Sequence, residues 1–161
     1  MELFLVRHAI AAPRTLTLPD EQRPLTRRGR ERFVQAVSGL ERLGVQLRQV
    51  HHSPWLRAAE TAALLAPVLS GELLPAKALA RPPDVSLLDE IDQTPAALVG
   101  HEPWMSEWMA MLVAGTRASG VMVAFKKGGV AWLEGQPRPG GMIIRAFLPP
   151  KVLRTLSGAK A

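Results

Sequence analysis

A short apolar run near the start of the chain ends in two side chains that can do chemistry. Residues 3–6 read Leu-Phe-Leu-Val, and Arg7 and His8 follow directly. Such a run is typical of a strand buried on both faces of a parallel sheet. Open α/β sheets bind ligands outside the carboxyl ends of their strands. The run therefore predicts a buried first strand that carries a guanidinium and an imidazole to a binding edge.

A second apolar run has the same ending. Residues 97–100 read Ala-Leu-Val-Gly, and His101 follows, with Pro103 two positions later. A proline is well tolerated at the first turn of a helix. This run therefore predicts a second strand-end histidine, placed just before a helix start.

A third segment, between the two runs, adds an arginine. Residues 53–61 read Ser-Pro-Trp-Leu-Arg-Ala-Ala-Glu-Thr. We expect Ser53 to cap this helix, Pro54 to take its first position and Arg57 to lie in its first turn, where the helix dipole favours an anion.

These segments together predict an anion pocket. Arg7 and Arg57 offer forked donors, His8 and His101 offer ring nitrogens, and the helix starts offer free N–H groups. Phosphate is the anion that uses guanidinium forks and helix N-termini best.

The rest of the chain alternates between the periodicities of strands and helices. The pattern predicts helices at 27–43, 55–69 and 104–114, and strands at 47–51, within 72–79, and at 121–125, 129–133 and 142–148. Thr26 can cap the first helix, and Trp104 and Trp108 are expected to pack in the core. The fold class expected is α/β, a single-domain three-layer sandwich whose mostly parallel central sheet has helices on both faces.

The chain organisation is simple. We expect residues 1–150 to form one catalytic domain and residues 151–161 a basic, frayed C-terminal tail. The 47% hydrophobic content excludes a disordered chain, and no apolar stretch reaches the ~20 residues that span a membrane. Because no leader pattern opens the sequence, the expected location is cytoplasmic. The absence of cysteine excludes thiol catalysis and cysteine-based zinc sites.

The net charge of +6 raises the question of a nucleic-acid partner. The dense basic cluster is confined to Arg27, Arg28, Arg30 and Arg32, and no nucleic-acid-binding motif accompanies it. We therefore expect no specific nucleic acid. Two interpretations of the cluster stay open, a solvated helix face and a patch that attracts phosphorylated acidic partners.

Metal and cofactor sites are not indicated. The four histidines do not share a helix face, and no carboxylate cluster joins them. The segment 126–129, Lys-Lys-Gly-Gly, lacks the order of a phosphate-binding P-loop, and no dinucleotide fingerprint follows the first strand. We expect neither a metal nor a cofactor.

Four separated motifs carry a family resemblance. Arg7-His8, the segment Arg-Pro-Leu-Thr at 23–26 with Gly29, the segment 53–61, and Gly-His-Glu-Pro at 100–103 occur in this order. Together they resemble the histidine phosphatase superfamily, also called phosphoglycerate-mutase-like, and within it the SixA-like phosphohistidine phosphatases. The match covers residues 1 to about 135.

The resemblance implies a phosphatase with a covalent phosphohistidine intermediate. His8 would be the nucleophile, Arg7, Arg57 and a protonated His101 would surround the phosphoryl oxygens, and Arg23 would bind substrate. The expected partner is a phosphorylated protein or a small phosphorylated substrate, with no membrane. Protein phosphohistidine is the substrate implied; the alternatives are a small-molecule phosphomonoesterase and a weakly active phosphate-recognising module. The oligomeric state is left open.

The chain departs from the family pattern at two points. Many relatives have glycine where this chain has Ala9, which matters where the backbone needs a positive φ. No acidic residue stands in a recognisable general-acid motif; the candidates are Asp84, Asp89, Glu90 and Asp92. We expect Asp84 or Ser86 to cap a short helix instead. A missing acid suits phosphohistidine, because its leaving imidazole can already carry a proton.

Overall fold

The computed structural model describes residues 1–158, apart from the side chains of residues 119 and 121. Six strands form one sheet in the order β3-β2-β4-β1-β5-β6. Strands β3, β2, β4 and β1 are parallel to one another, whereas β5 pairs antiparallel with β1 and β6. The α/β class with a mostly parallel sheet is therefore confirmed.

Strands and α-helices alternate through most of the chain. The order is β1 (Glu2–Arg7), α1 (Arg27–Arg42), β2 (Leu47–His52), α2 (Leu56–Ala63), β3 (Leu69–Pro75), β4 (Ala96–Gly100), α3 (Trp104–Ala114), β5 (Val130–Gly135), β6 (Met142–Leu148) and α4 (Pro150–Leu156). Short 3₁₀ helices lie at Asp20–Gln22, Ala66–Val68, Lys77–Ala80, Val85–Glu90 and Arg117–Met122. Within residues 1–158, no helix combines the length and apolarity needed to cross a membrane.

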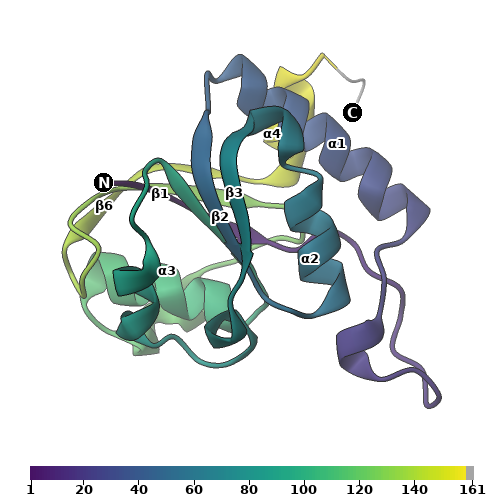
Figure 1. Cartoon of the computed structure of the whole chain (residues 1–161), viewed down its shortest axis with the longest axis horizontal. Helices are drawn as coiled ribbons and strands as arrows, with labels where there is room; N and C mark the ends of the chain where they lie inside the picture. Colours follow the sequence, from purple (N-terminus) through teal and green to yellow (C-terminus); the bar gives the residue numbers. More distant parts are fainter. Residues whose placement is uncertain (159–161) are drawn as a thin grey trace.

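The central strands divide their side chains between two cores. Phe4 and Val6 of β1 join the core beneath α1, α2 and α4, whereas Leu3 and Leu5 join the core beneath α3. Strand β4 alternates in the same way, which is the period of two that a strand imposes. Figure 1 shows the resulting layers, with α1, α2 and α4 on one side of the sheet and α3 on the other. Helices cover both faces, as expected.

Helix α1 begins and ends close to the predicted limits. The Thr26 hydroxyl accepts a hydrogen bond from the N–H of Gly29 at 2.9 Å, which caps the helix start. Phe33, Val37 and Leu40 recur at helical spacing and are buried. Local sequence therefore determines this helix well.

The predicted helix at 55–69 is shorter than expected. Helix α2 ends at Ala63, and a separate 3₁₀ turn follows at Ala66–Val68. Pro67 has no N–H to continue an α-helical ladder, which explains the break. The cap is also displaced, because Trp55 rather than Ser53 is the N-cap residue.

The predicted strand at 121–125 is wrong. Residues Arg117–Met122 form a 3₁₀ helix that packs along α3. A side chain at Gly120 would meet the backbone nitrogen of Glu107 at 2.9 Å, so the segment lies directly on the helix backbone. The apolar run at 121–125 therefore covers a helix instead of joining the sheet.

The C-terminal segment also differs from expectation. Residues 150–156 form α4 rather than a frayed tail, and Leu153 is fully buried against α1. A Cβ atom at Gly39 would lie 2.1 Å from the Leu153 carbonyl oxygen, so only glycine permits this approach. The expected fraying of residues 159–161 lies outside the described residues.

Candidate functional site

The carboxyl ends of β1, β4 and β2 place three polar residues at one edge of the sheet. The His8 N–H donates to the Gly100 carbonyl at 3.0 Å, and the Ser53 N–H donates to the Val99 carbonyl at 2.9 Å. The ring centroids of His8 and His101 are 5.1 Å apart. The parallel pairing of these strands thus brings together residues that are distant in sequence.

A cavity of about 360 Å³ lies at this edge. The lining includes all five predicted site residues, namely Arg7, His8, Arg23, Arg57 and His101. Two further cations, Arg14 and Lys127, and one carboxylate, Glu102, also line it. The cavity is therefore strongly cationic, which suits an anionic ligand.

His8 is held in one tautomer. Its Nδ1 lies 2.7 Å from the Ala9 carbonyl oxygen, to which it donates, so Nε2 keeps its lone pair. Burial, followed by the charges of Arg57, Arg7 and Lys127, lowers the pKa of His8 to about 3 despite the hydrogen bond to Ala9. The imidazole is consequently neutral at physiological pH and has an unprotonated nitrogen.

Arg57 is fixed between His8 and Asp20, an acidic residue of the 3₁₀ helix between β1 and α1. Its Nε lies 3.3 Å from His8 Nε2, its Nη1 donates to the Asp20 carbonyl at 2.6 Å, and its Nη2 donates to the Asp20 carboxylate at 3.0 Å. Asp20 also accepts from Arg14 and Arg23 at 2.9 and 2.8 Å. Partial burial raises the pKa of Asp20, but these cations outweigh it and lower the pKa to about 2.

Two buried nitrogen atoms of residues that line the cavity have no partner among the described residues. They are Arg7 Nε and His101 Nδ1. Arg7 uses its Nη1 to donate to the Phe125 carbonyl. Because buried polar atoms are normally satisfied, the two atoms are candidates to bind a ligand oxygen.

His101 is packed among aromatic and polar neighbours. Its Nε2 lies 2.8 Å from the Ser53 hydroxyl, and its ring centroid lies 4.6 Å from that of Trp55 and 6.2 Å from that of Trp104. Burial, and then the charges of His8 and Arg57, lower the pKa of His101 to about 2. This favours neutral His101 in the free protein; the protonated state is the one expected beside a bound phosphoryl group, whose negative charge would raise the pKa. Trp108 is buried in the core as expected, whereas Trp104 lies beside His101.

Ala9 fits its position without strain. Within residues 1–158 no residue other than glycine has a positive φ, so this position does not need glycine. The Ala9 N–H donates to the Thr61 hydroxyl at 3.0 Å. This departure from the family pattern therefore leaves the loop intact.

The expected acidic candidates lie away from the cavity. Asp84 caps the 3₁₀ helix Val85–Glu90 through the Ser86 N–H, as predicted, and Asp92 accepts from Gln49. None of the four candidates lines the cavity, whereas Glu102 does. The signal that could have identified Glu102 is its place directly after His101.

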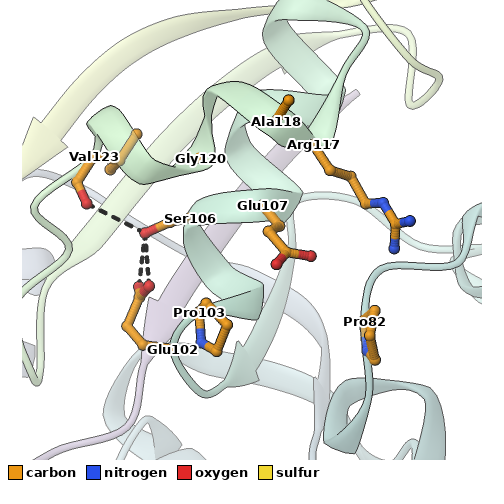
Figure 2. Close-up of a pocket in the computed structure, with 9 residues that line it drawn as sticks. All are labelled: Pro82, Glu102, Pro103, Ser106, Glu107, Arg117, Ala118, Gly120 and Val123. Atoms are coloured by element: carbon orange, nitrogen blue, oxygen red, sulfur yellow. Dashed lines mark hydrogen bonds between the residues drawn. The ribbon is translucent and has the colours of Figure 1, made fainter.

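Glu102 also borders a second and larger cavity of about 710 Å³. Figure 2 shows Ser106 of α3 beside the Glu102 carboxylate, where its hydroxyl donates at 2.8 Å. Burial raises the pKa of Glu102, against the lowering effects of Ser106 and the Arg7 charge. Glu102 thus lies between the cationic cavity and this second one.

Asp20, Lys127 and Ser53 are the other residues that sequence reasoning did not place in the site. Asp20 precedes Arg23 by three positions, which is a usable ion-pair spacing, but its contact with Arg57 spans 37 residues.

Among residues 1–158, no group of three or more His, Asp or Glu side chains could hold a metal ion.

Comparison with known sequences identifies a relative of this chain. No family model matches it. An uncharacterised protein of Picosynechococcus sp. is 34% identical over 144 residues, which cover 83% of this chain and 85% of that protein. The chain belongs to the same family as this protein.

Solved structures confirm the fold. The protein histidine phosphatase SixA, complexed with tungstate, has a TM-score of 0.76 and 23% identity, with 95% of this chain and 99% of that chain covered. A phosphoserine phosphatase from Entamoeba histolytica has a TM-score of 0.70 and 14% identity, covering 94% and 98%. An alpha-ribazole phosphatase from Shigella flexneri has a TM-score of 0.70 and 16% identity, covering 93% and 97%. The chain has the histidine phosphatase fold, and the expected resemblance to SixA is confirmed at that level.

Proposed function

We propose that this protein is a phosphatase that passes a phosphoryl group through a covalent phosphohistidine on His8, with protein phosphohistidine as its substrate. The observation that carries the proposal is the neutral His8 imidazole, whose free Nε2 lies in a cavity lined by four arginines and a lysine. A nucleophile must be unprotonated, and a phosphoryl group needs surrounding cations. A site that only bound phosphate would need no such nitrogen.

In the first step the Nε2 lone pair of His8 attacks phosphorus. The bond from phosphorus to the leaving nitrogen breaks, and its electron pair stays with the imidazole of the substrate. Charge spreads over the three equatorial oxygens in the loose transition state, so donors aimed at them accelerate the step. Arg7, Arg57 and Arg23 are the proposed donors, and the unpartnered His101 Nδ1 is a fourth once protonated.

In the second step water attacks the phosphorus of phosphohistidine. The bond between phosphorus and His8 Nε2 breaks, its electron pair returns to Nε2, and the water proton leaves with the products. The sum of both steps is phosphohistidine plus water giving histidine plus inorganic phosphate. The backbone bond from His8 Nδ1 to Ala9 keeps the ring in one orientation throughout.

Glu102 supports a second candidate function. It is the carboxylate that lines the cavity, and burial raises its pKa toward the range of a proton donor. A donor of this kind would help an alkoxide to leave, as a small-molecule phosphomonoesterase requires. Its hydrogen bond to Ser106 turns the carboxylate toward the second cavity, which favours the first candidate.

The relatives are consistent with either substrate class. The structures of similar fold include a histidine phosphatase, a phosphoserine phosphatase and an alpha-ribazole phosphatase. The tungstate in the SixA structure is a tetrahedral oxyanion, the kind of ligand that we propose for the cationic cavity here.

The test compares three substrates with the wild-type protein: a phosphohistidine protein, nitrophenyl phosphate and a sugar phosphate. We expect fast release of phosphate from the first two and slow release from the third, because no acid assists an alkoxide. Fast hydrolysis of the sugar phosphate would favour the phosphomonoesterase. Tight phosphate binding without turnover of any substrate would indicate a recognition module.

A further inference from the structure

Cations also line another pocket, which is bordered by Ala9 and Ile10. Arg32 of α1, Lys126 and Lys127 of the loop before β5, and Lys151 and Arg154 of α4 line a cavity of about 190 Å³. We call these five residues and this cavity the basic pocket. No aspartate or glutamate lines it. Five positive charges around one small cavity repel one another unless an anion neutralises them.

The cations of the basic pocket lack acidic partners within the described part of the chain. The ion pairs of residues 1–158 involve seven other arginines. On α1 itself, Arg27 pairs with Glu31 and Arg30 pairs with Glu60, whereas Arg32 has no such neighbour. Arg28 and Arg42 of α1 are unpaired among the described residues as well, but Arg32 is the arginine of this helix that lines the basic pocket.

Two cations of the basic pocket, Arg154 and Lys127, lie near other positive charges. Burial, and then the charges of Arg32 and Arg28, lower the pKa of Arg154. Burial, and then the charges of Arg7, Arg23 and Arg57, lower the pKa of Lys127. Arg154 and Lys127 thus have neighbours of their own sign, a condition that a bound anion would relieve.

The basic pocket is joined to the phosphoryl site. Lys127 lines both cavities, and Ala9, the residue after the proposed nucleophile, lines the basic pocket. The Gly128 N–H donates to the carbonyls of Arg7 and His8 at 3.0 and 3.1 Å, which ties the loop to the end of β1. A ligand bound at His8 therefore has cations on the adjacent surface within reach of its neighbouring groups.

The size and lining of the pocket indicate which anion it takes. A volume of about 190 Å³ is below the roughly 300–1,000 Å³ typical of sites for a drug-sized molecule, but it admits carboxylate side chains. The one aromatic residue in the lining, Phe33, is only 2% exposed and offers no face for a nucleobase to stack on. Carboxylates of a protein therefore fit better than a nucleotide or a nucleic acid.

We propose that the basic pocket binds aspartate or glutamate side chains that flank the phosphorylated residue of an acidic protein substrate. The inference rests on the proposed phosphatase function and adds the class of protein that it acts on. The basic cluster of α1 had two open interpretations, a solvated helix face and a patch that attracts acidic partners. Under this proposal Arg32 belongs to the patch. Arg27 and Arg30, which are paired, remain part of the solvated helix face.

Binding is tested apart from turnover. The probes are two unphosphorylated peptides of equal length, one with glutamates around a central histidine and one with glutamines in their place. We expect the wild-type protein to bind the glutamate peptide at least about tenfold more tightly at low salt, with the difference shrinking as salt rises. Equal affinities of the two peptides would overturn the proposal.

Three substitutions remove three of the five positive charges of the basic pocket and change no residue that lines the phosphoryl cavity. The variant combines Arg32→Gln, Lys151→Gln and Arg154→Gln, and its matched control combines Arg48→Gln, Lys77→Gln and Arg138→Gln, which removes three exposed charges elsewhere. We expect the pocket variant to lose the preference for glutamate and the control to keep it. If both lose it equally, net charge alone explains the binding and the pocket proposal fails.

Turnover separates this proposal from the function itself. The substrates are phosphohistidine versions of the glutamate and glutamine peptides. The pocket variant should show a KM for the glutamate peptide about tenfold above that of the wild type, with kcat unchanged. Its rates with nitrophenyl phosphate should equal those of the wild type. If the acidic peptide binds but no phosphate is released, the phosphatase function is refuted and the pocket proposal stands. If phosphate is released equally from the acidic and the neutral peptide, the pocket proposal is refuted and the phosphatase function stands. Tighter binding of an RNA oligonucleotide than of the glutamate peptide would overturn the pocket proposal, because the ligand would then be a nucleic acid. Should the triple variant not fold, exposed Lys151→Gln alone is expected to weaken glutamate-peptide binding about twofold or more, and no change would count against the pocket.

Discussion

The Nε–H of Arg57 donates a hydrogen bond of 3.3 Å to Nε2 of His8, the nitrogen that carries the lone pair. The guanidinium therefore already touches the atom that would attack phosphorus, before any substrate is present. When a phosphoryl group arrives, the same donor can shift from the lone pair to a phosphoryl oxygen. The contact links the proposed nucleophile with the proposed clamp.

Replacing the proposed nucleophile should abolish turnover. His8→Ala is expected to remove hydrolysis of nitrophenyl phosphate, since no other unprotonated nucleophile has the place of Nε2. Rapid quenching at neutral or alkaline pH should trap an acid-labile phosphate on His8 of the wild type. Near-wild-type rates in the variant, with a folded state verified by circular dichroism, would refute the assignment.

Replacing the arginine clamp should slow phosphoryl transfer. Arg7→Ala and Arg57→Ala are each expected to reduce kcat about 10²-fold, the scale of losing one oxyanion donor. Lysine at either position should recover only part of the rate, because a point charge cannot reproduce the guanidinium fork. Exposed Arg81→Ala is the control. Equal kcat for lysine and arginine would show that the two residues supply charge alone.

Asp20 should act through the arginines that it holds. Asp20→Asn removes the charge that anchors Arg57 and Arg23, so we expect kcat/KM for nitrophenyl phosphate to fall about tenfold and the inhibition constant of vanadate to rise. Glu21→Gln, in the same 3₁₀ turn, is the matched control. An unchanged vanadate constant in Asp20→Asn would contradict a positioning role.

Acid should destabilise the protein through its buried histidines. The pKa values of His8 and His101 in the folded protein, about 3 and about 2, lie below the unfolded value of about 6.5. Below pH 6.5 the unfolded chain therefore binds protons that the folded chain does not. The contribution of these two histidines to the free energy of unfolding is full above pH 6.5. It decreases as the pH falls, by up to about 1.4 kcal/mol per pH unit for each histidine.

Urea unfolding at pH 7, 6 and 5 measures this dependence. His8→Gln removes one of the histidines whose pKa is lowered in the fold, so its unfolding free energy should decrease less steeply than that of the wild type as the pH falls. Identical slopes for the two proteins would mean that His8 titrates normally in the fold.

Glu102 decides between the two substrate classes. If the leaving group needs no acid, Glu102→Gln should change the rates with phosphohistidine and nitrophenyl phosphate by less than about threefold, like its control Glu107→Gln. The amide variants of Asp84, Asp89, Glu90 and Asp92 should also change little, because none lines the cavity. A loss of 10² or more that appears with sugar phosphates alone would identify Glu102 as a general acid.

The sequence alone determined the elements that follow from local periodicity. The continuous apolar runs of β1 and β4, the Thr26 cap and the spacing of Phe33 and Val37 each depend on neighbours a few residues apart. Because parallel strands end at the same edge, the placement of Arg7, His8 and His101 around one cavity could be predicted as well. These inferences need no knowledge of which strands are adjacent.

The tertiary structure decided what depends on contacts between distant segments. The apolar run at 121–125 reads equally well as a strand or as a cover for α3, and only the close approach of Gly120 to that helix selects the second. Three contacts join residues 27 to 114 positions apart: Arg57 with Asp20, Lys127 with Arg154 around the basic pocket, and Leu153 with Gly39. No local pattern encodes such contacts, because chain packing, and not the spacing of side chains along one element, brings these charges and backbones together.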